Sequence, residues 1–170
     1  MKKVIIINGQ GGVGKDTLIG FVAENYKTSM ISSITPVKEV AARAGWEGEK
    51  DLKSRRFLSE LKKLMTQYND APLFYCKSML DGFLKTDEEI LFVQIREPKE
   101  ICRFEQCCEE CGIHAYTLLI RNSRISKEYG NSSDDGVENY DYDFTYDNDL
   151  QLMQAKDDFM NFFKSSIIDG

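Results

Sequence analysis

The sequence contains no apolar run long enough to cross a membrane and no excess of positive charge. Its first apolar run, Val4–Ile7, is too short for the core of a signal peptide, and glycines follow it closely. Lysines and arginines number 22 against 28 aspartates and glutamates, so the net charge is −6. This balance argues against broad binding to nucleic acids or membranes, and we expect neither as a partner. A polyanionic ligand must therefore bind at a local cluster of basic residues.

Cysteines and histidines are also few, with five of the first and one of the second. An odd cysteine count in a domain of this size does not indicate a disulfide framework, so we expect a cytoplasmic protein with reduced thiols. The spacing of Cys108, Cys111 and His114, with Cys107 adjacent, would allow a zinc site. A structural zinc site needs four ligands, and the chain has no second cysteine pair elsewhere. Cys108 and Cys111 also fall on the predicted buried face of a helix, so we favour core thiols over metal ligands.

The most informative stretch is a glycine-rich segment that joins a predicted strand to a predicted helix. The strand is Val4–Ile7, and apolar residues recur at helical spacing from Leu18 to Tyr26. Between them the sequence reads Gly9-Gln10-Gly11-Gly12-Val13-Gly14-Lys15-Asp16-Thr17. Glycines let backbone N–H groups converge on an anion, and the following helix points its positive end at the same place. With Lys15 supplying a charge, this order predicts a phosphate-binding loop rather than an ordinary glycine turn.

The loop departs from the general G-x-x-x-x-G-K-[ST] pattern at one position. Gly9, Gly14 and Lys15 fit, but Asp16 stands where a serine or threonine would bind magnesium, and a hydroxyl follows as Thr17.

The sequence Gly-Lys-Asp-Thr at 14–17 resembles the loop of deoxynucleoside monophosphate kinases, relatives of the adenylate kinases. Metazoan phosphomevalonate kinases carry a related loop. The resemblance implies ATP as phosphoryl donor and Mg²⁺ as cofactor, with Asp16 and Thr17 as candidate metal-binding residues. The implied ATP-binding residues are Gly9, Gly11, Gly12, Val13, Gly14, Lys15, Asp16, Thr17 and Asn148. Asn148 enters this set because the turn at 147–149 resembles the segment that holds adenine in these kinases.

A helical insert is expected at about 36–85, between a second strand at 29–34 and a third at 90–95. Helices are predicted from Pro36 to about residue 44, and then from apolar periodicity over 57–68 and 73–84. By resemblance this insert binds the acceptor, and the candidate acceptor-binding residues are Lys38, Arg55 and Arg56. A solvated basic face is an equally open interpretation of the two arginines.

The third strand ends in a segment that resembles the D-x-R-x-P-x-E signature of the same kinases. Arg96, Pro98 and Glu100 match it, but Gln94 stands in place of the aspartate. Arg96 is expected to stabilise charge on the moving phosphoryl group, and the neutral Gln94 leaves magnesium binding in question.

After a fourth strand at 115–120, the chain is polar up to about residue 141. The resemblance implies a short lid at about 121–141 whose Arg121 and Arg124 contact the transferring phosphoryl group. A surface loop is the alternative. A fifth strand at 142–146 and a last helix over 152–167 complete the expected elements.

Strands alternating with helices require a parallel sheet with helices on both faces. The resemblance implies one P-loop NTPase domain over 1–170, a three-layer α/β sandwich with strand order 2-3-1-4-5. The expected function is ATP-dependent phosphoryl transfer to a nucleoside or deoxynucleoside monophosphate, catalysed by Lys15, Arg96, Arg121 and Arg124. The alternatives are a kinase for a non-nucleotide phosphate such as phosphomevalonate, or a nucleotide-binding protein without turnover.

Overall fold

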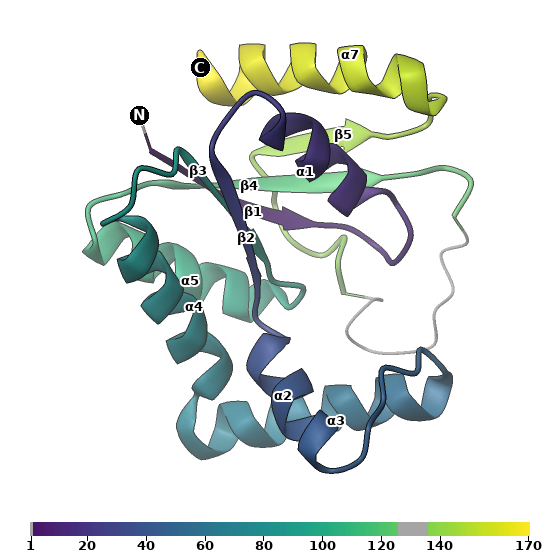
Figure 1. The fold of residues 1–170 in the computed structure, drawn as a ribbon, viewed down its shortest axis with the longest axis vertical. Helices are drawn as coiled ribbons and strands as arrows, with labels where there is room; N and C mark the ends of the chain where they lie inside the picture. Colours follow the sequence, from purple (N-terminus) through teal and green to yellow (C-terminus); the bar gives the residue numbers. More distant parts are fainter. Residues whose placement is uncertain (1, 126–135) are drawn as a thin grey trace.

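The computed structural model describes residues 2–125 and 136–170. In this part of the chain a five-stranded sheet has the order β2-β3-β1-β4-β5, and each neighbouring pair is parallel (Figure 1). The strands are β1 (Lys3–Asn8), β2 (Thr28–Ser32), β3 (Ile90–Gln94), β4 (Ala115–Arg121) and β5 (Phe144–Asp147). The predicted strand order is confirmed.

Helices cover both faces of the sheet, as the predicted three-layer arrangement requires (Figure 1). They are α1 (Lys15–Ala23), α2 (Thr35–Arg43), α3 (Leu52–Asn69), α4 (Ala71–Phe83), α5 (Pro98–Glu110) and α7 (Leu152–Phe163), which a short π-helix, η1 (Lys164–Ile168), extends. Helices α1 and α7 pack on one face, whereas α4 and α5 pack on the other. Helices α2 and α3 lie beyond the end of the sheet. None of the helices in 2–125 and 136–170 is long and apolar enough to cross a membrane.

Strand β1 forms the centre of the core because every residue from Val4 to Ile7 is buried. Ile5 and Ile7 pack with the α1–α7 layer, while Val4 and Ile6 pack with the α4–α5 layer. This alternation follows from the two-residue period of a strand, and burial of both faces explains the continuous β-branched run.

Two predicted strand boundaries were wrong. Strand β2 ends at Ser32 rather than at residue 34, because the chain turns at Ser33 and enters α2 at Thr35. Strand β5 begins at Phe144 rather than at Tyr142. The side chains before β5 make other bonds: the Tyr142 hydroxyl contacts Asn8, and the Asp143 carboxylate accepts from the backbone and hydroxyl of Thr117.

Candidate functional site

The glycine-rich loop joins the end of β1 to the start of α1, and two of its glycines are required by the backbone. Gly9 has a φ of 147°, and a Cβ there would lie 2.5 Å from the carbonyl oxygen of Ile120. Gly14 has a φ of 95°, and a Cβ there would lie 2.5 Å from Nδ2 of Asn148. At Gly9 both the backbone conformation and a clash with backbone exclude other residues, whereas at Gly14 the left-handed φ is the main ground, because the nearest atom ends a side chain.

Helix α1 begins at Lys15, and no side chain caps its N-terminus. The first N–H groups of a helix lack intrahelical partners and carry the positive end of its dipole, so they can bind an anion. The ammonium of Lys15 folds back over the loop and donates to the carbonyls of Gly9 at 2.6 Å and Gln10 at 2.9 Å. The loop therefore places a cation beside the helix N-terminus, as phosphate binding requires.

The end of β3 contacts the first turn of α1 through a pair of side chains. Nε2 of Gln94 donates to Oδ1 of Asp16 at 2.9 Å and lies 3.3 Å from the sulfur of Met30. The amide that replaces the expected strand-end aspartate therefore orients Asp16. A second carboxylate at this position would repel the first.

The oxygen atoms near this pair fit a magnesium ion that keeps most of its waters. Asp16 offers a carboxylate and Thr17 a hydroxyl, and both residues are exposed. Magnesium prefers oxygen ligands and is often bound through one or two carboxylates together with substrate phosphates. Within the described residues, no group of three or more histidine, cysteine, aspartate or glutamate side chains could hold a metal ion.

Asn8 connects the loop to two neighbouring segments, although it is 1% exposed. Its Oδ1 accepts from the N–H of Gly9 at 2.8 Å, and its Nδ2 donates to the carbonyl of Arg96 at 3.2 Å. The same Nδ2 donates to the hydroxyl of Tyr142, which in turn donates to the carbonyl of Val137 at 2.7 Å. Burial raises the pKa of Tyr142 to about 12, so its hydroxyl stays protonated and keeps donating. Arg96 is thereby held close to the start of the loop.

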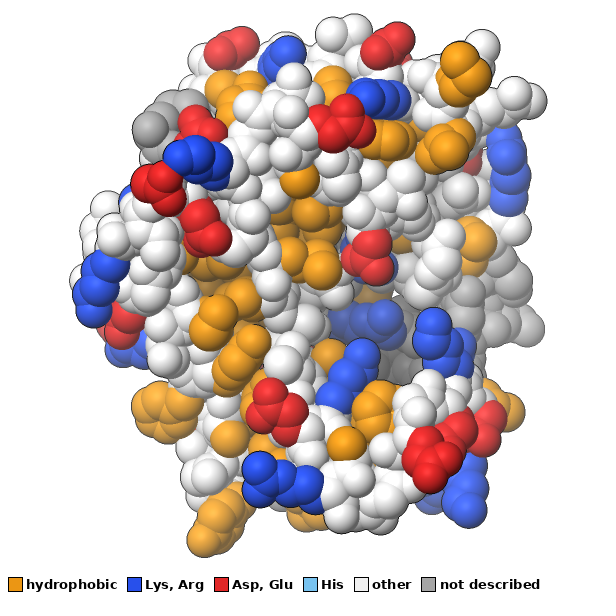
Figure 2. Space-filling model, viewed as in Figure 1, with side chains coloured by type: hydrophobic (Ala, Val, Ile, Leu, Met, Phe, Trp, Pro, Cys, Tyr) orange, Lys and Arg blue, Asp and Glu red, His pale blue; other side chains and the backbone are white. Residues whose placement is uncertain are grey.

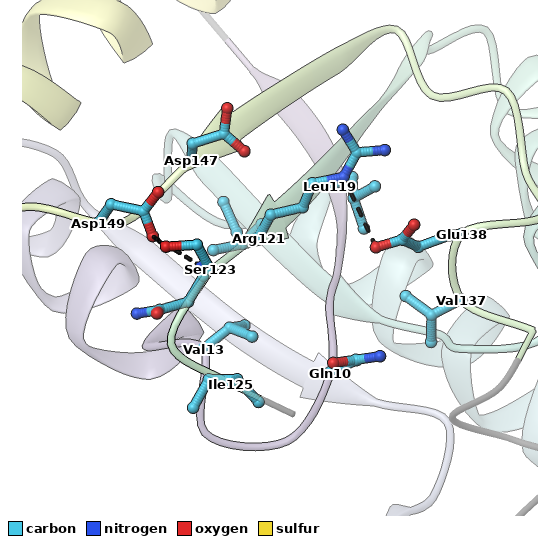
Figure 3. A pocket seen from close by; sticks show the side chains of 12 residues that line it. Gln10, Val13, Leu119, Arg121, Ser123, Ile125, Val137, Glu138, Asp147 and Asp149 are labelled. Carbon is cyan, nitrogen blue, oxygen red and sulfur yellow. Dashed lines mark hydrogen bonds and ion pairs between the residues drawn. The ribbon is translucent and has the colours of Figure 1, made fainter. Parts of the chain in front are cut away.

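A cavity of about 480 Å³ lies at the ends of β4 and β5 (Figure 3). Its walls include Gln10 and Val13 from the loop, Arg121 at the end of β4, Ser123 after β4 and Asp149 after β5. This size falls within the range of small-molecule and cofactor sites.

The polar groups around this cavity form a connected network. The N–H of Asn148 donates to the carbonyl of Arg121 at 2.8 Å, and its Nδ2 donates to the carbonyl of Val13 at 2.9 Å. Asp149 accepts from the backbone N–H of Ser123 at 2.7 Å, and this bond lowers the pKa of the Asp149 carboxyl. Asn148 therefore joins the phosphate loop to the two strand ends.

The predicted lid arginines lie at this end of the sheet in different settings. Nε of Arg121 lies 3.7 Å from Oε1 of Glu138, beside the cavity, whereas Arg124 donates to the carbonyl of Asp149 at 2.5 Å. Of the predicted lid at 121–141, residues 126–135 lie outside the described part of the chain.

The three predicted acceptor-binding residues do not share one surface. Lys38 is exposed on α2, and Arg55 is partly buried on α3. Arg56 is exposed and lines an open groove on another side of α3, together with Phe57 and Glu60. Figure 2 shows a hollow above the position of α3, with lysine and arginine side chains around it.

Three of the five cysteines are buried where α4 and α5 pack, whereas Cys111 is partly buried and Cys102 is exposed. Cys76, Cys107 and Cys108 are buried, and burial raises the pKa of the Cys108 thiol to about 12. His114 packs edge-on against the ring of Tyr116, with centroids 4.7 Å apart. These positions agree with the favoured interpretation of core thiols.

Comparison with known proteins identifies the architecture. No protein-family model matches the chain, and no curated protein matches its sequence. A tunicamycin resistance protein from Deinococcus radiodurans superposes with a TM-score of 0.58 at 12% identity, over 95% of each chain. A sugar kinase from Janibacter sp. gives 0.54 at 10% identity, over 96% of this chain and 95% of that chain. The APS kinase of Mycobacterium tuberculosis, in complex with AMPPNP and APS, gives 0.51 at 10% identity, over 96% of this chain and 98% of that chain.

The chain has the P-loop NTPase fold that these proteins share.

Sequence reasoning missed three residues near the carboxyl ends of the strands. Asn8 ends an apolar strand with a polar side chain, a signal that could have been noticed. Lys62 and Glu97 form an ion pair although they lie 35 residues apart in sequence, and no local sequence pattern predicts such a contact.

Proposed function

We propose that the protein transfers a phosphoryl group from ATP to a nucleoside or deoxynucleoside monophosphate in the cytoplasm. One observation carries the proposal: the uncapped start of α1 and Lys15 lie in one region with the arginine-bearing ends of β3 and β4. P-loop kinases bring a donor triphosphate and an acceptor together at such an end of the sheet.

In this proposal the loop from Gly9 to Thr17 holds the donor phosphates. Its backbone N–H groups and the start of α1 bind the phosphate oxygens, and Lys15 neutralises the outer phosphates. The Lys15 ammonium already lies over the loop, 2.6 Å from the carbonyl of Gly9. Magnesium would bridge and neutralise phosphate oxygens, and Asp16 and Thr17 are the residues that would hold its water shell.

The cavity between β4, β5 and the loop is the proposed site for the adenine of ATP. Asn148 lies beside it and bonds to both the loop and the end of β4. Backbone groups fixed in this way can recognise the edge of a base without a charged side chain.

Arg96, Arg121 and Arg124 are the proposed groups that stabilise the transferring phosphoryl group. Phosphoryl transfer needs little covalent chemistry from the protein, so positioned cations and donors supply most of the rate. Hydrogen bonds hold the backbones of two of them, because Asn8 donates to the carbonyl of Arg96 and the N–H of Asn148 donates to that of Arg121. Arg55, on the inward face of α3, is the proposed contact for the acceptor phosphate, whereas Lys38 and Arg56 lie on other surfaces and stay predictions from the sequence.

A nucleotide-binding protein without turnover is the second candidate, and the Gln94–Asp16 pair favours it. The neutral amide at the end of β3 supplies no charge to a metal ion.

An ADP-release assay distinguishes the two candidates. The protein is incubated with ATP and magnesium and with each of a panel of nucleoside monophosphates, with phosphomevalonate and inorganic phosphate as further acceptors. We expect release above the ATP-only rate with at least one nucleoside monophosphate. ATP binding without such release would contradict the kinase proposal and support the binding protein.

A further inference from the structure

Helix α3 buries a lysine more deeply than any of its apolar residues, of which Leu58, Leu61 and Met65 are only partly buried. The only residue of α3 that is buried is Lys62, which is 8% exposed, whereas Leu64 and Tyr68 are 62% and 88% exposed. The inward face carries Arg55, Ser59, Lys62 and Thr66, which recur at intervals of three and four residues. An amphipathic helix normally buries its apolar stripe. The inward face of α3 is therefore mixed, and its most buried position is a lysine that needs polar partners.

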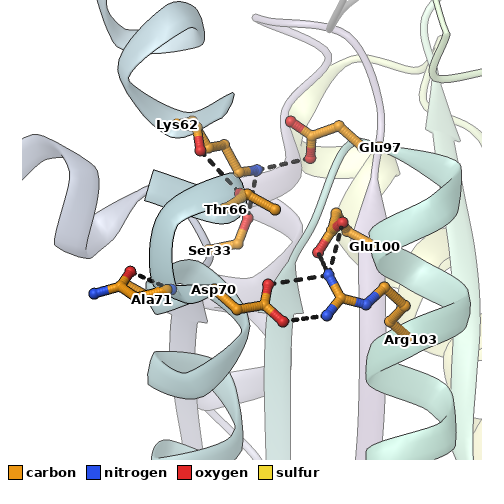
Figure 4. Close-up of polar contacts among 9 residues, drawn as sticks. Ser33, Lys62, Thr66, Asp70, Ala71, Glu97, Glu100 and Arg103 are labelled. Carbon is orange, nitrogen blue, oxygen red and sulfur yellow. Dashed lines mark hydrogen bonds and ion pairs between the residues drawn. The ribbon is translucent and has the colours of Figure 1, made fainter. Parts of the chain in front are cut away.

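The buried Lys62 bonds to two side chains at the ligand-facing end of the sheet. Its Nζ donates to Oγ of Ser33 at 2.9 Å and to Oε2 of Glu97 at 2.7 Å (Figure 4). Ser33 directly follows β2, and Glu97 directly follows Arg96 in the turn after β3. A buried ammonium is costly unless it is paired, so this lysine depends on Glu97.

The side chain of Glu97 does not cap the helix that follows it. Glu97 occupies the N-cap position of α5, but its side chain makes no capping hydrogen bond. Lys62 holds Oε2, while Oε1 has no hydrogen bond to any residue in 2–125 or 136–170. The Glu97 side chain is 31% exposed against 10% for Lys62. A molecule that approaches this pair from solvent would therefore meet a carboxylate oxygen rather than the ammonium.

A second ion pair in the same region, between Arg103 and Asp70, provides a comparison, because it only joins parts of the protein to one another. Arg103 on α5 donates to both carboxylate oxygens of Asp70, the residue between α3 and α4, and also bonds to Glu100 (Figure 4). Both oxygens of Asp70 are therefore used within the protein, whereas Glu97 keeps one oxygen available.

We propose that Glu97 is a specificity-determining residue of the acceptor site and that Lys62 and Ser33 position it. Oε1 of Glu97 accepts a hydrogen bond from an N–H group of the acceptor's nucleobase. Lys62 lies seven residues from Arg55 on the same face of α3, or about 10 Å along the helix. The acceptor then extends along this face, with its phosphate toward Arg55 and its base toward Glu97.

This inference rests on the proposed function and makes it more specific. A carboxylate attracts hydrogen-bond donors and repels a second anion. Phosphomevalonate carries a carboxylate in addition to its phosphate, so Glu97 disfavours that acceptor. A nucleobase presents N–H donors and no charge.

The test compares acceptor kinetics in four variants. Glu97→Gln keeps the shape but replaces the carboxylate with an amide, and Lys62→Met removes the group that orients it. Lys62→Arg keeps a cation, and Glu60→Gln is the matched control because Glu60 is exposed on the outer side of α3. KM and kcat are measured for ATP and for the guanine, adenine, cytosine and thymine monophosphates, and thermal unfolding is followed for each variant.

We expect Glu97→Gln and Lys62→Met to raise the KM of the best acceptor at least tenfold and to change the order of preference among bases. The KM for ATP should stay within twofold, Lys62→Arg should recover part of the loss, and the control should match the parent. A uniform loss for every acceptor and for ATP, with a lower unfolding temperature, would make the cluster a structural clamp and overturn the inference alone. A parent enzyme that phosphorylates none of the monophosphates would overturn the proposed function, and the inference with it.

Discussion

The proposed donor side and the proposed acceptor side of this molecule are built in different ways. On the donor side the backbone does most of the work: glycine conformations, an uncapped helix and peptide groups at the strand ends shape the loop and its cavity. On the acceptor side the surface consists of side chains from α2 and α3, and its polar groups depend on packing with β2 and β3. Backbone sites tolerate almost no change at a few positions, whereas side-chain sites can be altered one contact at a time.

The largest effect is expected from a single methyl group in the loop. Gly9→Ala places a Cβ 2.5 Å from the carbonyl oxygen of Ile120 at a φ of 147°. Strain of this kind costs about 1–3 kcal/mol before the clash is counted, so we expect a loss of at least about 3 kcal/mol in the free energy of unfolding. Urea unfolding measures it. Gly11→Ala is the stability control, because a Cβ there has open space and an allowed φ. Equal stabilities would show that the loop backbone is more adaptable than its geometry indicates.

Lys15→Ala should leave the fold intact and remove a charge from the donor phosphates. By analogy with the loss of one preorganised donor, we expect about 3 kcal/mol of transition-state stabilisation to disappear, or roughly a hundredfold in kcat/KM. Initial rates with ATP and the best acceptor provide the measurement, and circular dichroism checks the fold. Lys164→Ala, which removes an exposed lysine beyond α7, is the matched control. Wild-type rates in Lys15→Ala would remove the loop from the donor site.

The two sides also differ in how far the sequence predicts them. The loop and every helix of the insert could be predicted, because glycine spacing and hydrophobic periodicity are local properties. The strand order came from the resemblance to deoxynucleoside monophosphate kinases. The orientation of α3 could not be predicted from these local properties. Its apolar residues predicted a helix correctly, but Phe57, Leu64 and Tyr68 face solvent. Lys62 is turned inward by Ser33 and Glu97, which lie 29 and 35 residues away in sequence. For the same reason, the sequence could not predict that the adjacent Arg55 and Arg56 lie on different faces of α3.

A smaller loss of stability is expected from removing a side-chain hydroxyl near the loop, which tests whether side chains as well as backbone hold the donor side. Tyr142→Phe removes the hydroxyl that joins Asn8 to the carbonyl of Val137. Leaving these buried groups without that partner should cost about 1–2 kcal/mol in the free energy of unfolding. Tyr68→Phe, at a position that is 88% exposed, should cost nothing measurable.

The pH dependence of the same variant provides a second check. The pKa of Tyr142 is raised to about 12, above the value near 10 of an unfolded chain. Its contribution is therefore complete below pH 10 and is lost as pH rises toward 12. Tyr142→Phe should lack this component of the alkaline loss of stability. An unchanged stability and alkaline profile would mean that the backbone alone holds the loop and its neighbours.

The smallest expected effect concerns the contact between Gln94 and Asp16, where the two sides meet. The amide of Gln94 donates to Oδ1 of Asp16 at 2.9 Å, so the carboxylate is oriented without a second negative charge beside it. Gln94→Asp would bring two carboxylates together, and their repulsion is relieved when a cation lies between them. We therefore expect this variant to have a lower unfolding temperature without magnesium and a lower magnesium midpoint for ATP binding. Asp16→Ala should raise that midpoint, because it removes the only carboxylate of the pair. Magnesium is titrated at fixed ATP concentration, with ATP affinity as the readout, and Gln94→Glu tests whether the shift follows charge or side-chain length. Unchanged midpoints in both Gln94→Asp and Asp16→Ala would exclude a role for this pair in magnesium binding and would strengthen the case for a nucleotide-binding protein without turnover.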